Sequence, residues 1–223
     1  MERVREEKQV QVNTGQVTLE GNLTIPPKAT GIVLFAHGSG SSRFSPRNQF
    51  VADVLVKGGL ATLLFDLLTS EEEEIDQWTR ELRFDINLLA GRLVGATDWL
   101  LQNEDTRDLN IGYFGSSTGA AAALIAATQK TDDIDAIVSR GGRPDLAGPA
   151  LPKVQAPTLL IVGGNDFPVI ELNQQAMHQM RTKNRLEIVP GASHLFEEPG
   201  TLEEAARLAR EWFQHYLGTP KES

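Results

Sequence analysis

The 223-residue chain contains no cysteine. Disulfides, thiolate nucleophiles and cysteine-ligated metal sites are therefore excluded. Positive charge is also scarce, because 30 aspartates and glutamates outnumber 21 lysines and arginines and leave a formal net charge of −9. Since nucleic acids and anionic membranes are bound through basic surfaces, we expect neither as a partner.

Long apolar runs are missing as well. The longest, such as ATLLFDLL and AAAALIAA, are far shorter than the roughly 18 residues that a membrane-spanning helix requires. The start, MERVREEKQV, carries charges where a signal peptide has its apolar segment. We therefore expect a soluble protein of the cytoplasm.

The motifs of nucleotide and metal binding are absent too. There is no G-x-x-x-x-G-K-[ST] loop, no G-x-G-x-x-G after a strand, and no pair of histidines with metal-ligand spacing. We therefore expect neither a cofactor nor a metal.

Strand and helix patterns alternate along most of the chain. Residues 8–13 and 16–25 alternate apolar and polar side chains, which predicts an antiparallel pair at a sheet edge. Short apolar runs, typical of strands buried on both faces, follow at residues 31–36, 60–68, 110–114, 134–139, 157–162 and 185–189. The pattern predicts a single α/β domain over residues 1–223, with a mostly parallel sheet of about eight strands and helices on both faces.

Helix boundaries are also readable in places. Ser45 is suited to cap a helix that begins at Pro46. Thr201 and Glu204 have the spacing of a capping box before the last helix. Residues 69–80, TSEEEEIDQWTR, are acidic and not clearly periodic, so we interpret them as a loop or a short lid rather than a separate cap domain. Trp78 either lines a pocket there or packs the loop down.

Residues 110–128, NIGYFGSSTGAAAALIAAT, combine a short apolar strand, a tight turn and an alanine-rich helix. The turn at residues 115–119 fits G-x-S-x-G, in which the middle serine, here Ser117, stands clear of the sheet. The flanking glycines are needed because a Cβ would clash in so sharp a bend. The motif is weak alone, so a serine nucleophile also requires a base and an acid in suitable loops.

The base is expected at His194. Of the four histidines, this one follows the last predicted strand, where it can reach Ser117. His37 precedes a glycine-rich loop and is expected to brace it, whereas His178 and His215 fall outside the apolar faces of their helices.

The acid must follow a strand between Ser117 and His194. Asp166 does so and is preferred, with Asp145 one strand earlier as the competitor. The order Ser117, Asp166, His194 is the order of the α/β-hydrolase triad. For the oxyanion we expect two backbone N–H donors, Thr118 after the nucleophile and Ser39 in the glycine loop, with Gly40 as the alternative to Ser39.

The segments HGSG, GSSTG, GGNDFP and GASH, in this order and spacing, resemble the α/β-hydrolase superfamily. The cap-free layout is similar to its dienelactone-hydrolase-like branch, and the resemblance covers roughly residues 17–217. It implies an esterase-type hydrolase that acts through an acyl-enzyme. Dienelactone hydrolases proper use a cysteine nucleophile, whereas this chain offers Ser117.

The resulting hypothesis is a serine hydrolase that cleaves carboxylic esters of small substrates. A non-catalytic ligand-binding protein on the same fold and an acyltransferase remain as alternatives. Four arginines in or just after loops at the catalytic edge either hold a substrate carboxylate or phosphate, together with Gly40, or pair with the acidic residues 71–74 and Asp145. They are Arg43, Arg47, Arg140 and Arg143.

Overall fold

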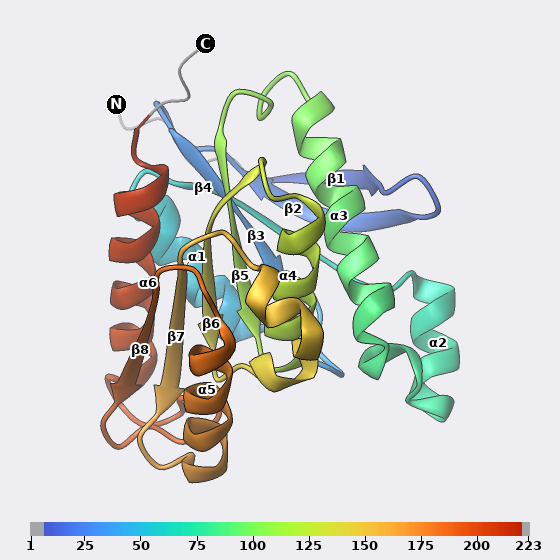
Figure 1. The fold of residues 1–223 in the computed structure, drawn as a ribbon. Helices are drawn as coiled ribbons and strands as arrows, with labels where there is room; N and C mark the ends of the chain where they lie inside the picture. Colours follow the sequence, from blue (N-terminus) through green and yellow to red (C-terminus); the bar gives the residue numbers. More distant parts are fainter. Residues whose placement is uncertain (1–6, 220–223) are drawn as a thin grey trace.

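The computed structural model describes residues 7–219, so the charged residues 1–6 considered above lie outside it. Within this range an eight-stranded sheet has the order β1-β2-β4-β3-β5-β6-β7-β8 (Figure 1). The strands are β1 (Glu7–Asn13), β2 (Thr18–Thr24), β3 (Gly31–Ala36), β4 (Ala61–Phe65), β5 (Asn110–Ser116), β6 (Ile134–Arg140), β7 (Thr158–Gly163) and β8 (Asn184–Val189).

The direction of the strands confirms the predicted α/β fold. β2 pairs antiparallel with both β1 and β4. Every pairing from β4 through β3, β5, β6 and β7 to β8 is parallel. Parallel neighbours require crossover connections, and the helices between the strands supply them.

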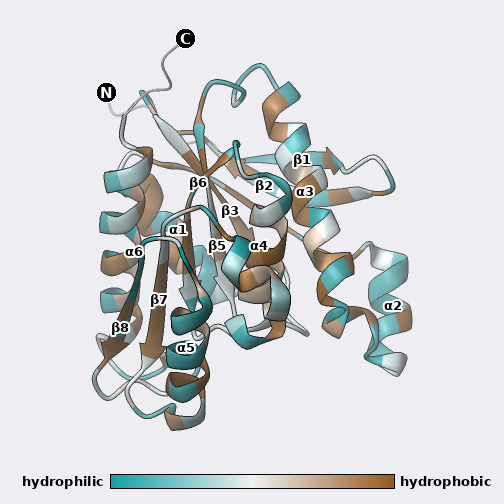
Figure 2. Cartoon of the chain, viewed as in Figure 1, coloured by the Kyte–Doolittle hydropathy of each residue, from teal (hydrophilic) through white to brown (hydrophobic). Residues whose placement is uncertain are grey.

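Helices cover both faces of the sheet (Figure 1). They are α1 (Pro46–Lys57), α2 (Ser70–Thr79), α3 (Ile86–Gln102), α4 (Thr118–Gln129), α5 (Phe167–Gln179) and α6 (Thr201–Leu217), with the 3₁₀ segments η1 (Leu82–Phe84) and η2 (Pro144–Lys153). One core lies between the sheet and α3, α4, α5 and η2, and the other lies between the sheet and α1 and α6. Figure 2 shows apolar strands beneath helices whose outer surfaces are polar.

The first helix begins as the sequence predicts. Ser45 precedes α1, and its hydroxyl accepts a hydrogen bond from the Asn48 backbone N–H, while Pro46 occupies the first helical position. Proline is tolerated there because the N–H that it lacks would have no partner within the helix. The cap fixes the start of α1 beside the loop that follows β3.

Of the two interpretations of residues 69–80, the loop is wrong, because Ser70–Thr79 form α2 with a complete capping box at Thr69, whereas the short lid stays a prediction. The Thr69 hydroxyl accepts from the Glu72 N–H at 3.2 Å, and the Glu72 carboxylate accepts from the Thr69 N–H at 2.9 Å. Trp78 neither lines a pocket nor packs the segment down, since it is 89% exposed. The run of glutamates starts a helix because acidic side chains favour its N-terminus.

The predicted capping box at Thr201 and Glu204 is also wrong. Gly200 is the residue before α6, and Thr201 is already helical and donates its hydroxyl hydrogen to the Glu198 carbonyl. Glu204 pairs with Arg207 instead. The same sequence spacing therefore serves a cap at Thr69 and not at Thr201, because the backbone conformation before each helix differs.

Buried charge fastens α2 to the body of the protein. Asp76 accepts backbone hydrogen bonds from Leu82 and Arg83 and pairs with the Arg83 side chain at 2.5 Å. Burial raises the pKa of Asp76, but the hydrogen bonds from Arg83 and Leu82 outweigh it and hold that pKa below its usual value. A second pair joins Glu72 of α2 to Arg92 of α3 at 2.6 Å.

No helix within residues 7–219 is long and apolar enough to cross a bilayer.

Candidate active site

The carboxyl ends of the parallel strands bring five predicted residues to one edge of the sheet. Ser39 follows β3, Ser117 follows β5, Arg140 ends β6, Asp166 follows β7 and His194 follows β8. This is the edge at which open parallel sheets bind ligands. Residues up to 155 positions apart in the chain, Ser39 and His194, thereby come to flank one cavity.

Ser117 has a strained backbone, with φ 52° and ψ −122°. A positive φ is uncommon for a side chain with a Cβ, costs of order 1–3 kcal/mol, and is concentrated at functional sites. The flanking glycines permit the bend: a Cβ on Gly115 would lie 2.4 Å from the Ala120 Cα, and one on Gly119 would lie 2.2 Å from the Ala36 carbonyl oxygen. The structure thus explains the G-x-S-x-G spacing by steric contact.

His194 and Asp166 are in direct contact. The His194 Nδ1 lies 2.6 Å from the Asp166 Oδ2. The competing carboxylate, Asp145, is instead engaged by Arg143 through two hydrogen bonds of 2.8 Å. Of the two acids that the sequence offers, the structure therefore places Asp166 with the histidine.

Ser117 and His194 line a common cavity of ≈250 Å³, which we call the serine cavity. Its other lining residues come from the loops after β3 and β6, from the start of α1 and from the His194 loop: Gly38, Ser39, Ser41, Ser45, Arg47, Ser116, Arg140, Gly141 and Leu195. Within the described residues no hydrogen bond joins Ser117 to His194. Such contacts commonly tighten only when substrate is bound.

The two candidate oxyanion donors meet at the start of α4. The Thr118 N–H has no backbone acceptor in the part of the chain that the structure describes, as expected at the first position of a helix. The Ser39 N–H donates to the Thr118 hydroxyl at 3.0 Å. The single hydrogen of the Ser39 N–H is therefore donated to Thr118 in this structure, a contact that the sequence analysis did not identify, and it becomes available to an oxyanion only when that hydrogen bond is exchanged.

His37 braces the loop that carries Ser39, as expected. Its Nε2 accepts from the Leu67 N–H at 3.1 Å, which leaves Nδ1 to donate to the Gly38 carbonyl at 2.9 Å. Burial lowers the pKa of His37 despite the opposing effects of Gly38 and Asp66, so the ring is held neutral. His178 and His215 are exposed, as the sequence predicts.

Glu198 supports the loop of His194. Its carboxylate accepts a hydrogen bond of 2.9 Å from the Ser193 N–H. Hydrogen bonds from Ser193 and from the backbone at 197–198 hold the pKa of Glu198 below its usual value. The sequence analysis did not identify this contact.

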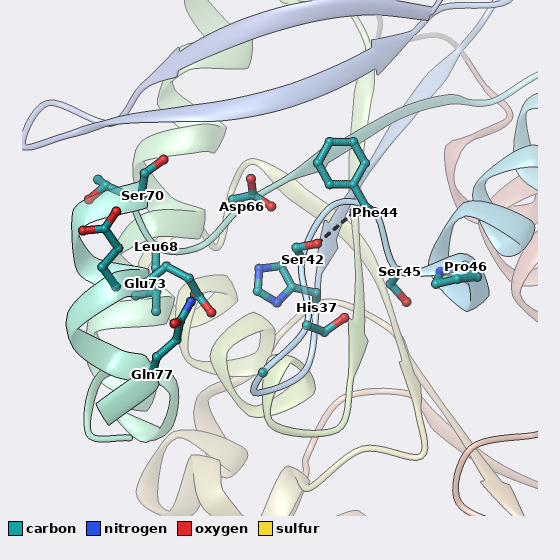
Figure 3. A pocket seen from close by; sticks show the side chains of 14 residues that line it. His37, Ser42, Phe44, Ser45, Pro46, Asp66, Leu68, Ser70, Glu73 and Gln77 are labelled. Atoms are coloured by element: carbon teal, nitrogen blue, oxygen red, sulfur yellow. Dashed lines mark hydrogen bonds between the residues drawn. The ribbon is translucent and has the colours of Figure 1, made fainter. Parts of the chain in front are cut away.

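A second, larger hollow of ≈510 Å³ lies between α2 and the loop after β3 (Figure 3), and we call it the α2 groove. Glu73 and Gln77 project from α2, Ser42 and Phe44 from the facing loop, and Asp66 lies between them (Figure 3). Ser41 and Ser45 line both hollows, which makes the two adjacent. Gly40 lines the α2 groove rather than the serine cavity.

The four arginines at this edge differ in their partners. Arg43 pairs with Asp66, and Arg143 pairs with Asp145, which was one of the predicted pairings. Arg47 is 3.9 Å from Glu197, and Arg140 makes no ion pair within the described residues. None of the ion pairs found in residues 7–219 joins these arginines to residues 71–74, and neither Arg43 nor Arg143 lines the serine cavity.

Metal ligation has no evident site at this edge. Among residues 7–219 no group of three histidine, aspartate or glutamate side chains is placed to hold a metal ion.

The fold is similar to that of several solved structures. A dienelactone hydrolase from Anabaena variabilis is 65% identical, with a TM-score of 0.95 over 96% of this chain and 100% of that one. Est1E from Butyrivibrio proteoclasticus, which has also been solved with ferulic acid bound, shares the fold at 16% identity, with a TM-score of 0.79 over 95% of this chain and 99% of its own.

Sequence comparisons add longer relatives and a family. A putative phosphoribosyl transferase of Mycobacterium tuberculosis is 58% identical over 214 residues, which are 96% of this chain and 47% of that protein. The chain therefore spans about half the length of the curated relatives that it matches. A profile of the Dienelactone hydrolase family matches residues 19–218. With its α/β-hydrolase fold, the chain belongs to the dienelactone hydrolase family.

Proposed function

We propose that this protein is a serine hydrolase that cleaves carboxylic esters of small molecules through an acyl-enzyme. The observation that carries the proposal is the 2.6 Å contact between the His194 Nδ1 and the Asp166 Oδ2. His194 lines the serine cavity together with Ser117. A hydroxyl is a poor nucleophile near neutral pH and needs such an oriented base. Membership of the dienelactone hydrolase family supports a hydrolase.

Each side chain has a defined step in the proposed reaction. The Ser117 hydroxyl attacks the ester carbonyl while the His194 Nε2 accepts its proton, and His194 then returns that proton to the leaving alcohol. Asp166 accepts the hydrogen of Nδ1, which keeps the ring in the required tautomer and stabilises the imidazolium. Water then attacks the acyl-enzyme while His194 accepts its proton. His194 returns that proton to the Ser117 oxygen, and the acid is released.

The oxyanion of the tetrahedral intermediate is assigned to two backbone donors. The Thr118 N–H opens α4, so it combines a free donor with the positive end of the helix dipole. Ser39 lines the serine cavity, and its N–H would exchange the 3.0 Å hydrogen bond with the Thr118 hydroxyl for one with the oxyanion. The acyltransferase alternative uses the same groups and differs only in whether water or another acceptor receives the acyl group.

A fluorophosphonate probe tests the proposal directly. We expect it to phosphonylate Ser117, since the probe reacts with serines that an adjacent base activates. Mass spectrometry of a digest locates the adduct. Absence of an adduct in folded protein would favour the alternative of a non-catalytic ligand-binding protein. The rate at which labelled and unlabelled protein release acid from an aryl ester is then compared. This comparison shows whether the adduct stops turnover.

The Thr118 hydroxyl gives a second prediction. Thr118→Val keeps the shape of the side chain but removes the hydroxyl that accepts the Ser39 N–H, so this N–H is free to donate to the oxyanion. We expect kcat to rise about fivefold to tenfold, the scale of one neutral hydrogen bond, with little change in KM. Thr118→Ser retains the hydroxyl and serves as the matched control. Equal kinetics of the valine and serine variants would show that the hydroxyl does not compete with the oxyanion for the Ser39 N–H.

A further inference from the structure

β8 is the last strand of the sheet, and its outer edge pairs with no other strand of residues 7–219 (Figure 1). On its inner side β8 pairs in parallel with β7, and the carbonyls of Lys183 and Val189 accept hydrogen bonds from that side. Successive residues of a strand point their backbone groups in opposite directions within the sheet, so the odd-numbered residues face β7. The N–H and C=O groups that point away from the sheet belong to Asn184, Leu186 and Ile188.

The two faces of this edge differ in chemistry, because side chains alternate along a strand. The even-numbered face, on the side of α5, presents the apolar side chains of Leu186, which is partly buried, and Ile188, which is 42% exposed. The odd-numbered face, on the side of α6, presents Arg185 and Glu187, which form an ion pair with each other. One face is thus apolar, and the other carries one charge of each sign.

The spacing of these two charges makes the edge complementary to itself. Charged side chains on an edge strand generally discourage pairing with another chain. When two copies of β8 pair antiparallel about a two-fold axis at Leu186, however, Arg185 of each copy lies directly opposite Glu187 of the other. The four charges then alternate in sign around the axis. Opposite charges directly across a strand pair are stabilising, whereas like charges are destabilising.

The backbone selects the same register. Antiparallel strands exchange hydrogen bonds only where outward-pointing residues oppose each other, so an even-numbered residue must face an even-numbered one. With the axis at Leu186, this residue faces its own copy and Asn184 faces Ile188, so every outward-pointing residue of β8 is bonded. An axis at Arg185 or at Glu187 also satisfies the backbone, but it places two arginines or two glutamates opposite each other. Charge and hydrogen bonding together therefore favour the axis at Leu186.

Side-chain packing on both faces is consistent with this register. On the even-numbered face Leu186 meets its own copy, and Ile188 lies diagonally across from Leu186 of the second copy, so the exposed apolar side chains form one stripe. On the odd-numbered face a hollow of ≈390 Å³ lies between β8 and α6, and Lys183 and Arg185 are among its lining residues. Glu187 of the second copy lies opposite Arg185 and diagonally across from Lys183, at the rim of this hollow.

The opposite edge of the sheet lacks this self-complementarity. Its strand, β1, also carries one acidic and one basic residue, but these are the adjacent Glu7 and Lys8. Adjacent side chains lie on opposite faces of a strand, so Glu7 cannot lie across from Lys8 of a second copy in any symmetric register. Of the two edges that the structure describes, only the β8 edge therefore matches its own copy in charge.

We infer that this protein forms a dimer in which the β8 edges of two copies pair antiparallel about Leu186 and join the two sheets into one. The contact uses the same surface of both copies, as a two-fold interface requires. It ends where the loop of His194 begins, because that loop follows β8. The inference goes beyond the proposed esterase function and does not depend on it.

The mass of the wild-type protein in solution is the first test. We expect analytical ultracentrifugation at micromolar concentration to give the mass of two chains. A monomer over the whole concentration range would overturn the inference. Ester hydrolysis is measured on the same sample: an inactive dimer would refute the proposed function and retain the interface, whereas an active monomer would do the reverse.

Charge reversal locates the interface. In Glu187→Arg both charges of β8 become positive, and in Arg185→Glu both become negative, so like charges would oppose each other in the dimer. We expect each variant to show half the mass of the wild type. Arg107→Glu is the matched control and should remain dimeric, because Arg107 lies outside β8 and its side chain is 57% exposed, against 61% for Arg185. Dimers in both reversed variants would contradict the pairing.

Restored complementarity separates this effect from misfolding. Mixed in equal amounts, the two monomeric variants should form a heterodimer, since the acidic edge of one meets the basic edge of the other. The double variant Arg185→Glu/Glu187→Arg exchanges the two charges and should form a homodimer again. If the wild type is dimeric and the variants are folded by circular dichroism, failure of both the mixture and the double variant to associate would refute the register.

Amide hydrogen exchange, followed by NMR, tests the strand pairing in the wild-type protein itself. We expect slow exchange of the Leu186 and Ile188 N–H groups in the dimer, because they would be bonded to the second copy, and fast exchange of both in monomeric Arg185→Glu. The Val189 N–H faces β7 and should exchange slowly in both proteins. A wild-type dimer with fast exchange at Leu186 and Ile188 would place the interface elsewhere and overturn the inference, even if the charge variants failed to fold.

Discussion

Replacing Ser117 by alanine should lower kcat for a short-chain aryl ester at least ~10³-fold, the scale of losing a triad member. The expected loss is large because His194 and Asp166 act only through the hydroxyl that attacks the carbonyl. The residual rate would come from the oxyanion donors and substrate binding, which the substitution leaves in place. Initial rates at saturating ester, compared with the wild type at equal concentration, measure the effect.

Ser116→Ala is the matched control for this experiment. Ser116 is the preceding residue of the same motif, but its hydroxyl contacts the Asn48 side chain at 3.4 Å. We expect this variant to retain most of its turnover. If Ser117→Ala keeps wild-type turnover, or if Ser116→Ala loses as much activity, Ser117 is not the nucleophile. Circular dichroism and Tm establish that both variants are folded.

Replacing Asp166 by asparagine should lower kcat about 10⁴-fold, the scale reported for this change in serine triads. The asparagine amide can occupy the same space, but it cannot hold the imidazole in the tautomer that leaves Nε2 free to accept the serine proton. The 2.6 Å contact of the His194 Nδ1 with Asp166 is the structural basis of this expectation. The size of the effect distinguishes an orienting carboxylate from a surface turn residue.

Asp145→Asn provides the comparison, because Asp145 was the other acid suggested by the sequence. Its carboxylate is engaged by Arg143, so the substitution should change stability more than turnover. An Asp145→Asn variant as inactive as Asp166→Asn would require the roles of the two carboxylates to be reassigned. Profiles of kcat against pH for each folded variant would show which substitution alters the pH dependence of turnover.

The names of the relatives describe two different activities, and the relatives with the two names also differ in length. The family profile and the 65% identical structure are those of dienelactone hydrolases. The name putative phosphoribosyl transferase belongs to proteins of which this chain matches 47%. The match leaves about half of each of those proteins without a counterpart here, so the name does not assign an activity to this chain.

Much of the geometry of the candidate site was predictable because its signals are local in the sequence. The turn around Ser117 is encoded by two glycines whose absent side chains prevent clashes at 2.2 and 2.4 Å. Apolar runs of strand length, each followed by a loop, indicate a parallel sheet, and the carboxyl ends of such strands share one edge. The order of the serine, acid and histidine could therefore be read from the chain alone.

Local signals also produced the errors. Thr69 with Glu72 and Thr201 with Glu204 have the same spacing, but only the first pair forms a capping box. Whether a threonine caps a helix depends on the conformation of the preceding chain, which tertiary contacts set. The run of glutamates at residues 71–74 was interpreted as part of a loop, but it belongs to a helix. This helix depends on the ion pairs of Asp76 with Arg83 and of Glu72 with Arg92.

The amino-acid order was sufficient to establish the α/β class, the strand–turn–helix unit of Ser117 and a short list of acids and bases. Folding in three dimensions was needed to bring Asp166 rather than Asp145 to His194 and to pair Arg43 and Arg143, while Arg140 has no carboxylate partner among residues 7–219. The physical reason is the range of the interactions. Steric limits and hydrophobic periodicity act between near neighbours in the chain, whereas charge pairing depends on which loops meet at the sheet edge.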